Sequence, residues 1–328
     1  MTAHASMLER PTTTALSFNR TVERSMVHRA AVAEVFVTDG LPIGEKRVLV
    51  GAQLPLTHGY FGDHLQRPAT VDPVLLLETA RQAGIYGAHL LGIPLEITML
   101  IGGFDLQITR PDALRIGSRP VELQVENTFE VRRRRGGRPR SGRVLQQLYV
   151  GSSYVGTHAL DILVLSRAEH DVVRAAVREG PIPSTADMLD IAHPEAVAPQ
   201  PVGRTHPANV VLGAARRTGD VQQALVAPRF GNHALFDHTY DHLPGLVLTE
   251  AARQLTYLAL GSVEATVVGL TARFTRFAEL DAPVVASTEV GKLADQPTTM
   301  HVTFHQGGTE VTEVTVTVVP SSTIGAQR

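Results

Sequence analysis

The chain has 328 residues, of which 43% are hydrophobic and 19% are charged, and its formal net charge is -2. This composition is typical of a soluble globular protein, and the length suggests two domains. A charge so close to zero argues against non-specific nucleic-acid binding as the main activity. Because the chain has no cysteine, disulfides, a thiolate nucleophile and cysteine-ligated metals are excluded. The sequence shows neither a membrane-spanning apolar run nor a signal peptide, so we expect a cytoplasmic protein.

The first part of the chain predicts an arm followed by a compact domain. Residues 1–28 mix polar and small side chains without a clear period, and we interpret them as an N-terminal arm. The first domain should cover residues 29–167. It opens with two apolar, strand-like runs at 31–37 and 47–52, and a connection rich in glycine and histidine follows the second run.

One long helix is predicted over residues 73–91, because Asp72 can cap its first N–H groups, Pro73 suits its first turn and Gly92 can end it. Its apolar side chains point in every direction, which is typical of a buried helix. Three alternating, β-rich stretches follow, at 97–109, 121–134 and 144–166. An antiparallel sheet wrapped around the helix accounts for this order.

The second half of the chain repeats the order of the first. Residues 168–205 are charged and helical at first and then rich in proline, which predicts an inter-domain linker. A second domain at 206–320 and a tail at 321–328 complete the chain. Its predicted helix covers 245–260, and its predicted strands lie near 210 and at 221–226, 265–277, 284–293, 298–305 and 311–319. The expected fold class is therefore α+β, with two similar units.

Each predicted helix carries nearly the same pentapeptide. The two copies are 172 positions apart in similar apolar surroundings, which indicates a duplicated unit. The glutamate, arginine and glutamine of each copy occupy positions i, i+3 and i+4, so they share one face of an otherwise apolar helix. The copies are Glu78-Thr79-Ala80-Arg81-Gln82 and Glu250-Ala251-Ala252-Arg253-Gln254.

Burying these charges costs on the order of several kcal/mol per ion unless the ions are paired or meet a ligand. In one interpretation, Glu78 with Arg81 and Glu250 with Arg253 are ion pairs that only survive within the core. In the other, they belong to a ligand or catalytic site. A chain rarely buries the same costly group twice for packing alone, so we favour a functional site in the second domain and leave both interpretations open for the first.

A histidine precedes each helix at a similar distance. His64 lies 14 residues before Glu78, and His238 lies 12 residues before Glu250. A histidine beside the mouth of a buried helix can exchange protons, but it can equally shape the loop, and the spacing alone favours the loop role. Four other histidines have weaker support, and the chain shows no paired metal-binding motif, so we expect neither a metal nor another cofactor. These four are His58, His158, His233 and His242.

These motifs resemble those of a known enzyme family. Residues 63–68 (DHLQRP) and 72–82 (DPVLLLETARQ) resemble the hot-dog fold 3-hydroxyacyl-ACP dehydratases, in which a catalytic histidine and a proline turn precede a helix with an acidic residue and Ala-Gln. Residues 241–254 (DHLPGLVLTEAARQ) repeat the pattern. The doubled form resembles more specifically the A-factor (γ-butyrolactone) synthase family. The resemblance covers about residues 30–320 and implies a tandem hot-dog fold, in which each unit is an antiparallel sheet wrapped round one long buried helix.

The resemblance implies an acyltransferase of autoregulator biosynthesis. Such enzymes are taken to transfer a β-ketoacyl group from an acyl carrier protein to the hydroxyl of dihydroxyacetone phosphate, after which the ester closes to a butenolide phosphate. The chain departs from the dehydratases because Arg81 and Arg253 replace a small or apolar residue, and because the second histidine-to-glutamate spacing is two residues shorter. Dehydration is therefore in doubt, whereas a guanidinium suits a phosphate-bearing acceptor.

The same chemistry assigns roles to the repeated residues. Glu250 is the leading candidate for the base, Arg253 for the phosphate ligand and His238 for orientation or proton relay, while the N-terminus of a buried helix supplies N–H donors for the thioester carbonyl. Hot-dog sites form between two units, so His64 should face the second helix and His238 the first. We favour the second site because its motif is fuller. The catalytic candidates are Glu250, His238, Glu78 and His64, and the substrate-binding candidates are Arg253, Arg81, Gln254 and Gln82.

The arginine-rich stretch 132–143 forms the tip of a predicted hairpin. Such a run is usually a solvated loop, and its functional alternative is a docking patch for an acidic carrier protein, made by Arg133, Arg134, Arg135 and Arg138. Nucleic-acid contact is a weaker option because no aromatic residues are interleaved with the charges. Two other functions stay open: a dehydratase or thioesterase acting on acyl-ACP, and a non-catalytic module that binds a lactone or acyl ligand.

Overall fold

A computed structural model of the chain describes residues 16–178, 180–189 and 194–325. Within this part of the chain, twelve antiparallel strands form one continuous sheet in the order β1-β2-β4-β5-β6-β3-β9-β12-β11-β10-β8-β7. The strands of the first unit are β1 (Val37–Gly44), β2 (Arg47–Leu54), β3 (Thr98–Ile108), β4 (Val121–Arg135), β5 (Arg138–Val150) and β6 (Ser153–Leu165). Those of the second unit are β7 (Leu212–Thr218), β8 (Val221–Val226), β9 (Ala265–Phe274), β10 (Val284–Glu289), β11 (Thr298–Gln306) and β12 (Thr309–Pro320).

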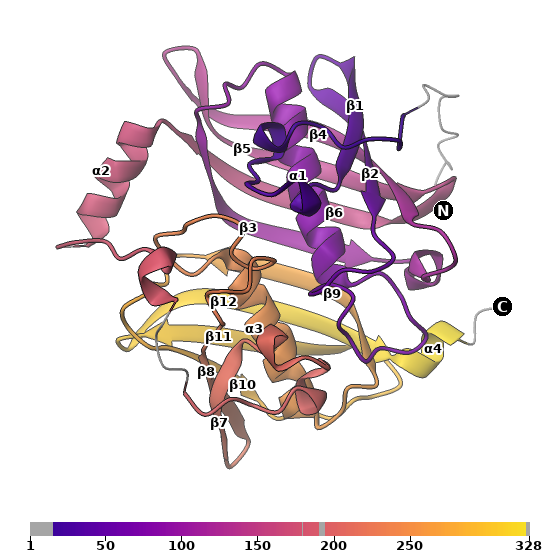
Figure 1. The fold of residues 1–328 in the computed structure, drawn as a ribbon, viewed down its shortest axis with the longest axis vertical. Coiled ribbons are helices and arrows are strands. Elements are labelled where there is room, and N and C mark those ends of the chain that lie inside the picture. The colour runs from indigo at the N-terminus through magenta and orange to yellow at the C-terminus, as the bar shows by residue number, and fades with distance from the viewer. Residues whose placement is uncertain (1–15, 179, 190–193, 326–328) are drawn as a thin grey trace, which may run out of the picture.

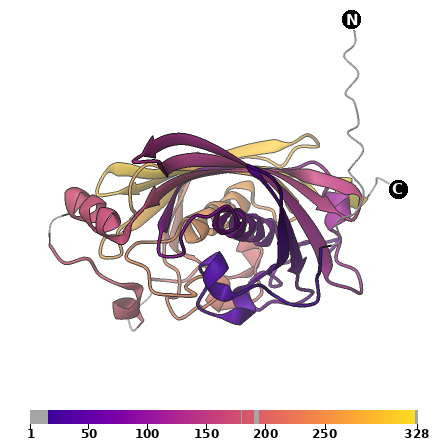
Figure 2. The ribbon, with the colours of Figure 1, turned by 90° about the horizontal axis from the view of Figure 1, so that it is seen from above.

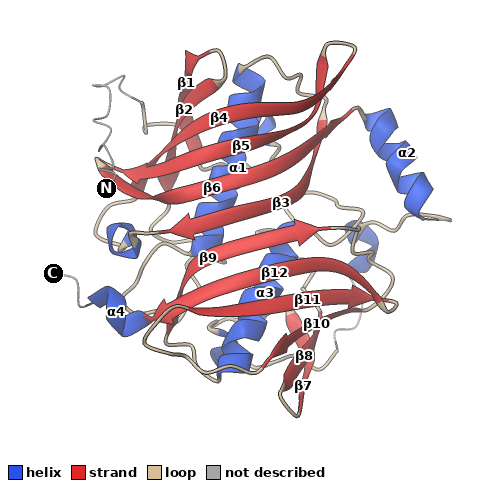
Figure 3. Cartoon of the chain, turned by 180° about the vertical axis from the view of Figure 1, so that it is seen from behind, coloured by secondary structure: helices blue, strands red, loops and turns tan. Residues whose placement is uncertain are grey.

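The two units join where β3 pairs with β9, so their sheets are continuous (Figure 3). Each half of the sheet curves around one helix, α1 (Pro73–Leu90) in the first unit and α3 (Gly245–Leu260) in the second (Figure 1). Where β3 and β9 pair, the two backbones lie so close together that a Cβ on Gly103 would be 2.7 Å from the carbonyl oxygen of Ala272. The predicted α+β architecture, with one antiparallel sheet around one long helix in each unit, is confirmed.

The first central helix has the predicted start and the predicted burial. Asp72 accepts a hydrogen bond from the N–H of Val74 at 2.7 Å, and Pro73 occupies the first turn. Fifteen of the 18 residues of α1 are buried. Viewed from above, the sheet arches over one side of α1, and the indigo N-terminal segment lies on the other side (Figure 2). The helix is therefore enclosed on both sides, which explains its apolar surface.

One strand prediction was wrong. The run 31–37 was expected to be a strand, but it contains a short 3-10 turn, Val32–Glu34, and β1 begins only at Val37. The reason is tertiary: the side-chain amide of Gln82 donates to the carbonyl oxygen of Glu34 and accepts from the N–H of Phe36. The side chain of Gln82 thus makes the backbone hydrogen bonds that a neighbouring strand would otherwise make. The stretch 144–166 also differs, because it is two strands, β5 and β6, and β5 already begins at Arg138.

The predicted arm and linker contain ordered structure. Residues 1–15 of the predicted arm lie outside the described residues, but Val22 N–H donates to Val37 O at 3.0 Å and Val27 is fully buried. In the predicted linker, α2 (Arg167–Val177) starts with a capping box between Ser166 and Glu169. A short helix, α4 (Ser321–Gly325), follows the last strand. No helix in the described part of the chain is long and apolar enough to cross a membrane.

Candidate active site

Two equivalent clusters of buried charges lie on the central helices. In the first unit, Glu78 forms the expected ion pair with Arg81, with Nε and Oε2 2.8 Å apart, and a second arginine, Arg29, donates from Nε to Oε1 at 3.1 Å. In the second unit, Glu250 contacts Arg253 and is also held by Arg204, whose Nε donates to Oε1 at 3.0 Å. Each buried carboxylate therefore has two guanidinium partners, which offsets the cost of burial.

Arg29 and Arg204 are members of the two charged clusters that the sequence does not predict. They lie 175 positions apart, close to the 172 of the pentapeptides, and each follows a valine by two residues in the segment before the first strand of its unit. This weak Val-x-Arg repeat was the available signal. Its first copy begins within residues 1–28, which the sequence predicts to be an arm outside the duplicated unit.

The two glutamines of the pentapeptides hold the backbone in identical ways. Gln254 donates to the carbonyl oxygen of Asn209 at 2.8 Å and accepts from the N–H of Val211 at 3.0 Å, as Gln82 does with the segment before β1. Both side chains also donate to the glutamate one turn earlier, and both residues are fully buried. Neither lines either of the two pockets described below.

Each unit completes the cluster of the other. Asp237 accepts hydrogen bonds from the N–H groups of Ala30 and Ala31 at 2.6 and 2.9 Å. Asp63 accepts from Thr205 and His206 of the second unit at 2.9 and 3.1 Å. Because of these reciprocal contacts, the histidine next to each aspartate lies beside the cluster of the other unit. His238 lies with the first cluster and His64 with the second, which is the expected arrangement.

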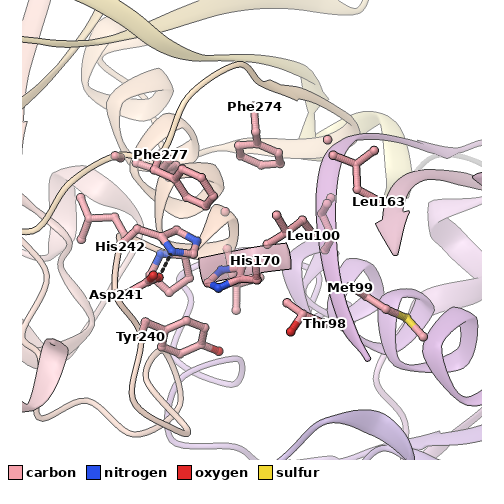
Figure 4. A pocket seen from close by; sticks show the side chains of 18 of the residues that line it. Thr98, Met99, Leu100, Leu163, His170, Tyr240, Asp241, His242, Phe274 and Phe277 are labelled. Atoms are coloured by element: carbon pink, nitrogen blue, oxygen red, sulfur yellow. Dashed lines mark hydrogen bonds and ion pairs between the residues drawn. The ribbon is translucent and has the colours of Figure 1, made fainter. Parts of the chain in front are cut away.

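The first cluster opens into a large pocket of about 1300 Å³. Its polar end contains Glu78, Arg81, Arg29 and His238, and residues of both units supply its walls. In Figure 4, Tyr240 and His242 approach from the second unit, while Met99, Leu100 and Leu163 face them from the first. The apolar wall residues include Leu77, Ile85, Met99, Leu100, Ile101, Phe104, Leu160, Leu163, Val173, Leu246, Phe274 and Phe277. The pocket thus joins a long apolar surface to a cluster of charges.

The second cluster is closed. His64 and Arg253 line a space of only about 10 Å³, and Glu250 is fully buried. Asp72, at the start of α1, closes this cluster. Its Oδ1 accepts a hydrogen bond from Nη1 of Arg253 at 2.7 Å, which joins the two helices. The equivalent position before α3, six residues ahead of the glutamate, is Pro244, which has no carboxylate.

Arg81 therefore lacks the second carboxylate partner that Asp72 provides for Arg253. Its Nε and Nη2 both donate to Glu78, but its Nη1 has no hydrogen-bond partner among the described residues. Its side chain is 20% exposed, in the large pocket, whereas that of Arg253 is 5% exposed. The two copies of the motif therefore differ in access, although their sequences are nearly the same.

Glu78 is an ionised and fully engaged carboxylate. Burial opposes its ionisation, but Arg29 and Arg81 outweigh burial and lower its pKa to about 2. It also accepts a hydrogen bond from Gln82 at 2.8 Å. Such a carboxylate is a weak base, and its contacts fix the direction of the Arg81 side chain.

This ionisation predicts a pH-dependent stability. Because the pKa of Glu78 falls from its ordinary 4.5 to about 2 in the folded state, its stabilisation should be complete above pH 4.5 and lost as the pH falls towards 2. The shift corresponds to about 3 kcal/mol. Denaturant titrations of wild type and Glu78→Gln from pH 7 to pH 2 measure this contribution, and the difference between their free energies of unfolding should narrow in acid. A difference independent of pH would contradict the ionised state of Glu78.

His238 combines a free ring nitrogen with a carboxylate partner. Its Nδ1 lies 3.4 Å from Oδ2 of Asp237, so we assign the proton to Nδ1 and leave Nε2 unprotonated. Burial lowers the pKa of His238, and Arg29 and Arg81 act in the same direction, while Asp237 opposes them. The ring is 4.2 Å from that of Tyr240, centroid to centroid. A neutral imidazole oriented by a carboxylate is suited to accept a proton from a bound hydroxyl.

The N-terminus of α3 also reaches the large pocket. Its N-cap is Pro244, no side chain caps it, and the N–H groups of Gly245 and Leu246 have no partner among the described residues. Both residues line the pocket. Free N–H groups at the positive end of a helix stabilise an oxygen that gains negative charge. In α1 the equivalent position is occupied by the capping carboxylate of Asp72.

His28 lines the pocket in a strained backbone conformation that the sequence did not reveal. Its φ is +53°, and the equivalent residue of the second unit is Gly203, with a φ of +75°. His28 Nε2 lies 2.9 Å from Nε2 of His89, whose Nδ1 donates to the carbonyl oxygen of Ile93 at 2.8 Å. This chain of contacts puts a proton on Nε2 of His28 and leaves Nδ1 free. Burial, then His89 and Arg81, lower the pKa of His28 to about 4, so the ring is neutral near pH 7.

The strain at His28 predicts an unusual order of stability. His28→Gly relieves the left-handed backbone but loses the contact with His89, so its stability should stay within about 1 kcal/mol of wild type. His28→Ala keeps the strain and loses the same contact, so it should be less stable than the glycine variant by about 1 kcal/mol. Chemical denaturation measures both. If the alanine variant were as stable as the glycine variant, the backbone at residue 28 would not be strained.

One continuous sheet whose two halves each curve around one helix, with charged sites built from both units, defines a tandem hot-dog protein. Residues 11–166 and 187–322 match the family model described as the A-factor biosynthesis hotdog domain. The chain belongs to this family, which confirms the resemblance seen in its motifs.

Several curated relatives support the assignment over most of the chain. A relative from Streptomyces virginiae is 32% identical over 297 residues, which cover 89% of this chain and 95% of the relative. One from Streptomyces griseus is 32% identical over 291 residues, covering 87% and 91%. One from Streptomyces coelicolor is 32% identical over 297 residues, covering 88% and 89%. Each of these relatives is described as a 2-oxo-3-(phosphooxy)propyl 3-oxoalkanoate synthase.

Proposed function

We propose that the protein is an acyltransferase that moves a β-ketoacyl group from a carrier-bound thioester to the hydroxyl of dihydroxyacetone phosphate. The observation that carries this proposal is the pocket at Arg81, where a guanidinium with a free edge lies at the polar end of an apolar cavity of about 1300 Å³. The named activity of the relatives supports the same reaction. Its product is the phosphorylated ester that can close to a butenolide.

The apolar part of the pocket suits the acyl donor. Aliphatic and aromatic side chains from β3, β6, α2 and β9 line it, and burial of an alkyl chain contributes about 0.8 kcal/mol per methylene. The N–H groups of Gly245 and Leu246 then face the thioester carbonyl. They stabilise its oxygen as the carbonyl carbon becomes tetrahedral.

The charged part suits the acceptor. Arg81 contacts the phosphate through the edge that carries Nη1, while Glu78 holds the other edge of the guanidinium. His238 Nε2 takes the proton of the acceptor hydroxyl as its oxygen attacks the thioester carbon. The C–S bond then breaks, and the leaving thiolate recovers the proton from the imidazolium. Asp237 stabilises the imidazolium during this step.

The proposed site is the first of the two, whereas the sequence favoured Glu250 and Arg253 of the second. The reason is access: the second cluster is closed by Asp72, and its charges are paired with one another. We propose that Glu250, Arg253 and His64 clamp the two helices together, and that Gln82 and Gln254 anchor the backbone. Glu78 positions Arg81, and His238 is the catalytic base.

The reaction can be tested directly. The protein is incubated with a 3-oxodecanoyl carrier-protein thioester and dihydroxyacetone phosphate, and the products are identified by mass spectrometry. A phosphorylated β-ketoester supports the proposal. An enoyl product would indicate a dehydratase, a free acid a thioesterase, and tight ligand binding without consumption of the thioester a binding module. Folded wild-type protein that makes no phosphorylated ester would refute the acyltransferase.

A further inference from the structure

The tip of the β4–β5 hairpin concentrates positive charge on the surface. Four arginines are exposed around the turn Gly136-Gly137, and none of the four lies within ion-pair distance of a carboxylate among the described residues. Arg135 and Arg138 are directly opposite each other in the strand pairing, an arrangement that destabilises a hairpin by itself. We call Arg133, Arg134, Arg135 and Arg138 the basic tip. Uncompensated repulsion of this kind is relieved when an anionic partner binds.

The hairpin that carries the basic tip contacts a helix that lines the pocket. Arg140, two residues after the tip, donates to Glu169 of α2 at 2.7 Å, so the hairpin and α2 are in contact. Figures 1 and 3 show both on the same side of the molecule. From α2, the side chains of His170, Val173 and Val177 line the same pocket that contains Arg81. The surface that carries the charge is therefore continuous with the wall of the site.

The outer face of α2 adds an apolar component. Val172 is 68% exposed, although its neighbour Val173 lines the pocket. Arg174 anchors the helix by its contacts with Glu279 and Asp241. An exposed valine on an anchored helix that contacts an arginine-rich hairpin matches a partner whose surface is acidic with an apolar part.

We propose that the basic tip and the outer face of α2 form the docking surface for the acidic carrier protein that delivers the acyl thioester. Docked there, the carrier holds its flexible arm at the α2 side of the pocket, and the arm extends inward to the α3 N-terminus. This inference rests on the proposed function, because it concerns the donor of the same reaction.

The test compares two matched charge reversals. Arg134→Glu with Arg135→Glu alters the basic tip, and Arg216→Glu with Arg217→Glu alters the exposed β7–β8 hairpin at the opposite end of the molecule (Figure 1). Each variant is assayed with a 3-oxodecanoyl carrier protein and with the small 3-oxodecanoyl N-acetylcysteamine thioester. The first variant should lose about tenfold in kcat/KM for the carrier substrate and nothing for the small one. The second should match wild type with both.

Salt and apolar contacts give independent readouts. The wild-type kcat/KM for the carrier substrate should fall as ionic strength rises, and the tip variant should lose most of this dependence. Val172→Glu should lower kcat/KM for the carrier about threefold or more and leave the small thioester unaffected. Equal loss with both thioesters, or no loss with either, would overturn the docking proposal.

A binding measurement separates this inference from the proposed reaction. Calorimetry with the 3-oxodecanoyl carrier protein and no acceptor reports docking whether or not transfer occurs. Weaker binding by the tip variant alone supports the surface even if wild type forms no ester. Binding of a DNA duplex that depends on the tip, together with unchanged carrier binding, would assign the surface to nucleic acid and overturn the proposal.

Discussion

Replacing Arg81 by methionine is expected to lower kcat/KM for dihydroxyacetone phosphate about 100-fold or more, and to lower the stability because Glu78 keeps only Arg29 as a guanidinium partner. The side chain reaches the pocket, and the substitution removes the charge-assisted hydrogen bonds to the phosphate, each worth about 1.5–3 kcal/mol. Steady-state kinetics with varied acceptor, together with thermal unfolding, measures both effects. The loss should fall on the acceptor, because the thioester contacts other parts of the pocket.

The matched control is Arg253→Met in the second copy of the motif. It leaves Glu250 and Asp72 with one fewer buried cation, so it should destabilise the protein by about 3–5 kcal/mol. The protein that remains folded should keep its affinity for the acceptor. If Arg253→Met abolished acceptor use and Arg81→Met did not, the active site would be the second cluster and the present assignment would be wrong.

Replacing His238 by asparagine should lower kcat by about 10²–10⁴-fold with either thioester, because it removes the base and leaves the substrate contacts. The pKa of His238 lies below its ordinary 6.5, so the wild-type rate should rise with pH in mildly acidic solution and reach half of its maximum below pH 6.5. The variant should lose this dependence. The pH profile separates a proton-transfer role from a structural one.

His64→Asn is the corresponding control. His64 lies in the closed cluster, where burial lowers its pKa and its Nδ1 has no hydrogen-bond partner among the described residues. The substitution should change stability and leave the pH profile of the reaction as it is in wild type. An unchanged kcat for His238→Asn would exclude His238 as the base.

The local signals in the sequence predicted the central elements well. Asp72, Pro73 and Gly92 mark the ends of α1, and the predicted helix 245–260 matches α3. These features depend on residues within a few positions of one another, where capping and turn preferences act. The pentapeptide also identified the glutamate of each cluster and one of its two arginine partners, because residues at positions i and i+3 share a helix face.

The remaining parts of the site depend on contacts between distant residues. Arg29 reaches Glu78 across 49 positions, and Asp72 reaches Arg253 across 181. No local pattern specifies such pairs, since they follow from the way two complete units pack. The choice between the two sites was therefore beyond the sequence: it depends on whether the residue that starts one helix meets the arginine of the other.

The reciprocal contacts of Asp63 and Asp237 have the geometry of a two-fold symmetric dimer within a single chain. In a homodimer, both copies of every position carry the same residue, and a change that opens one site opens the other as well. Joining the copies removes that restriction. Asp72 and Pro244 could therefore differ, so that one copy of the charged cluster is closed while the other opens into the large pocket.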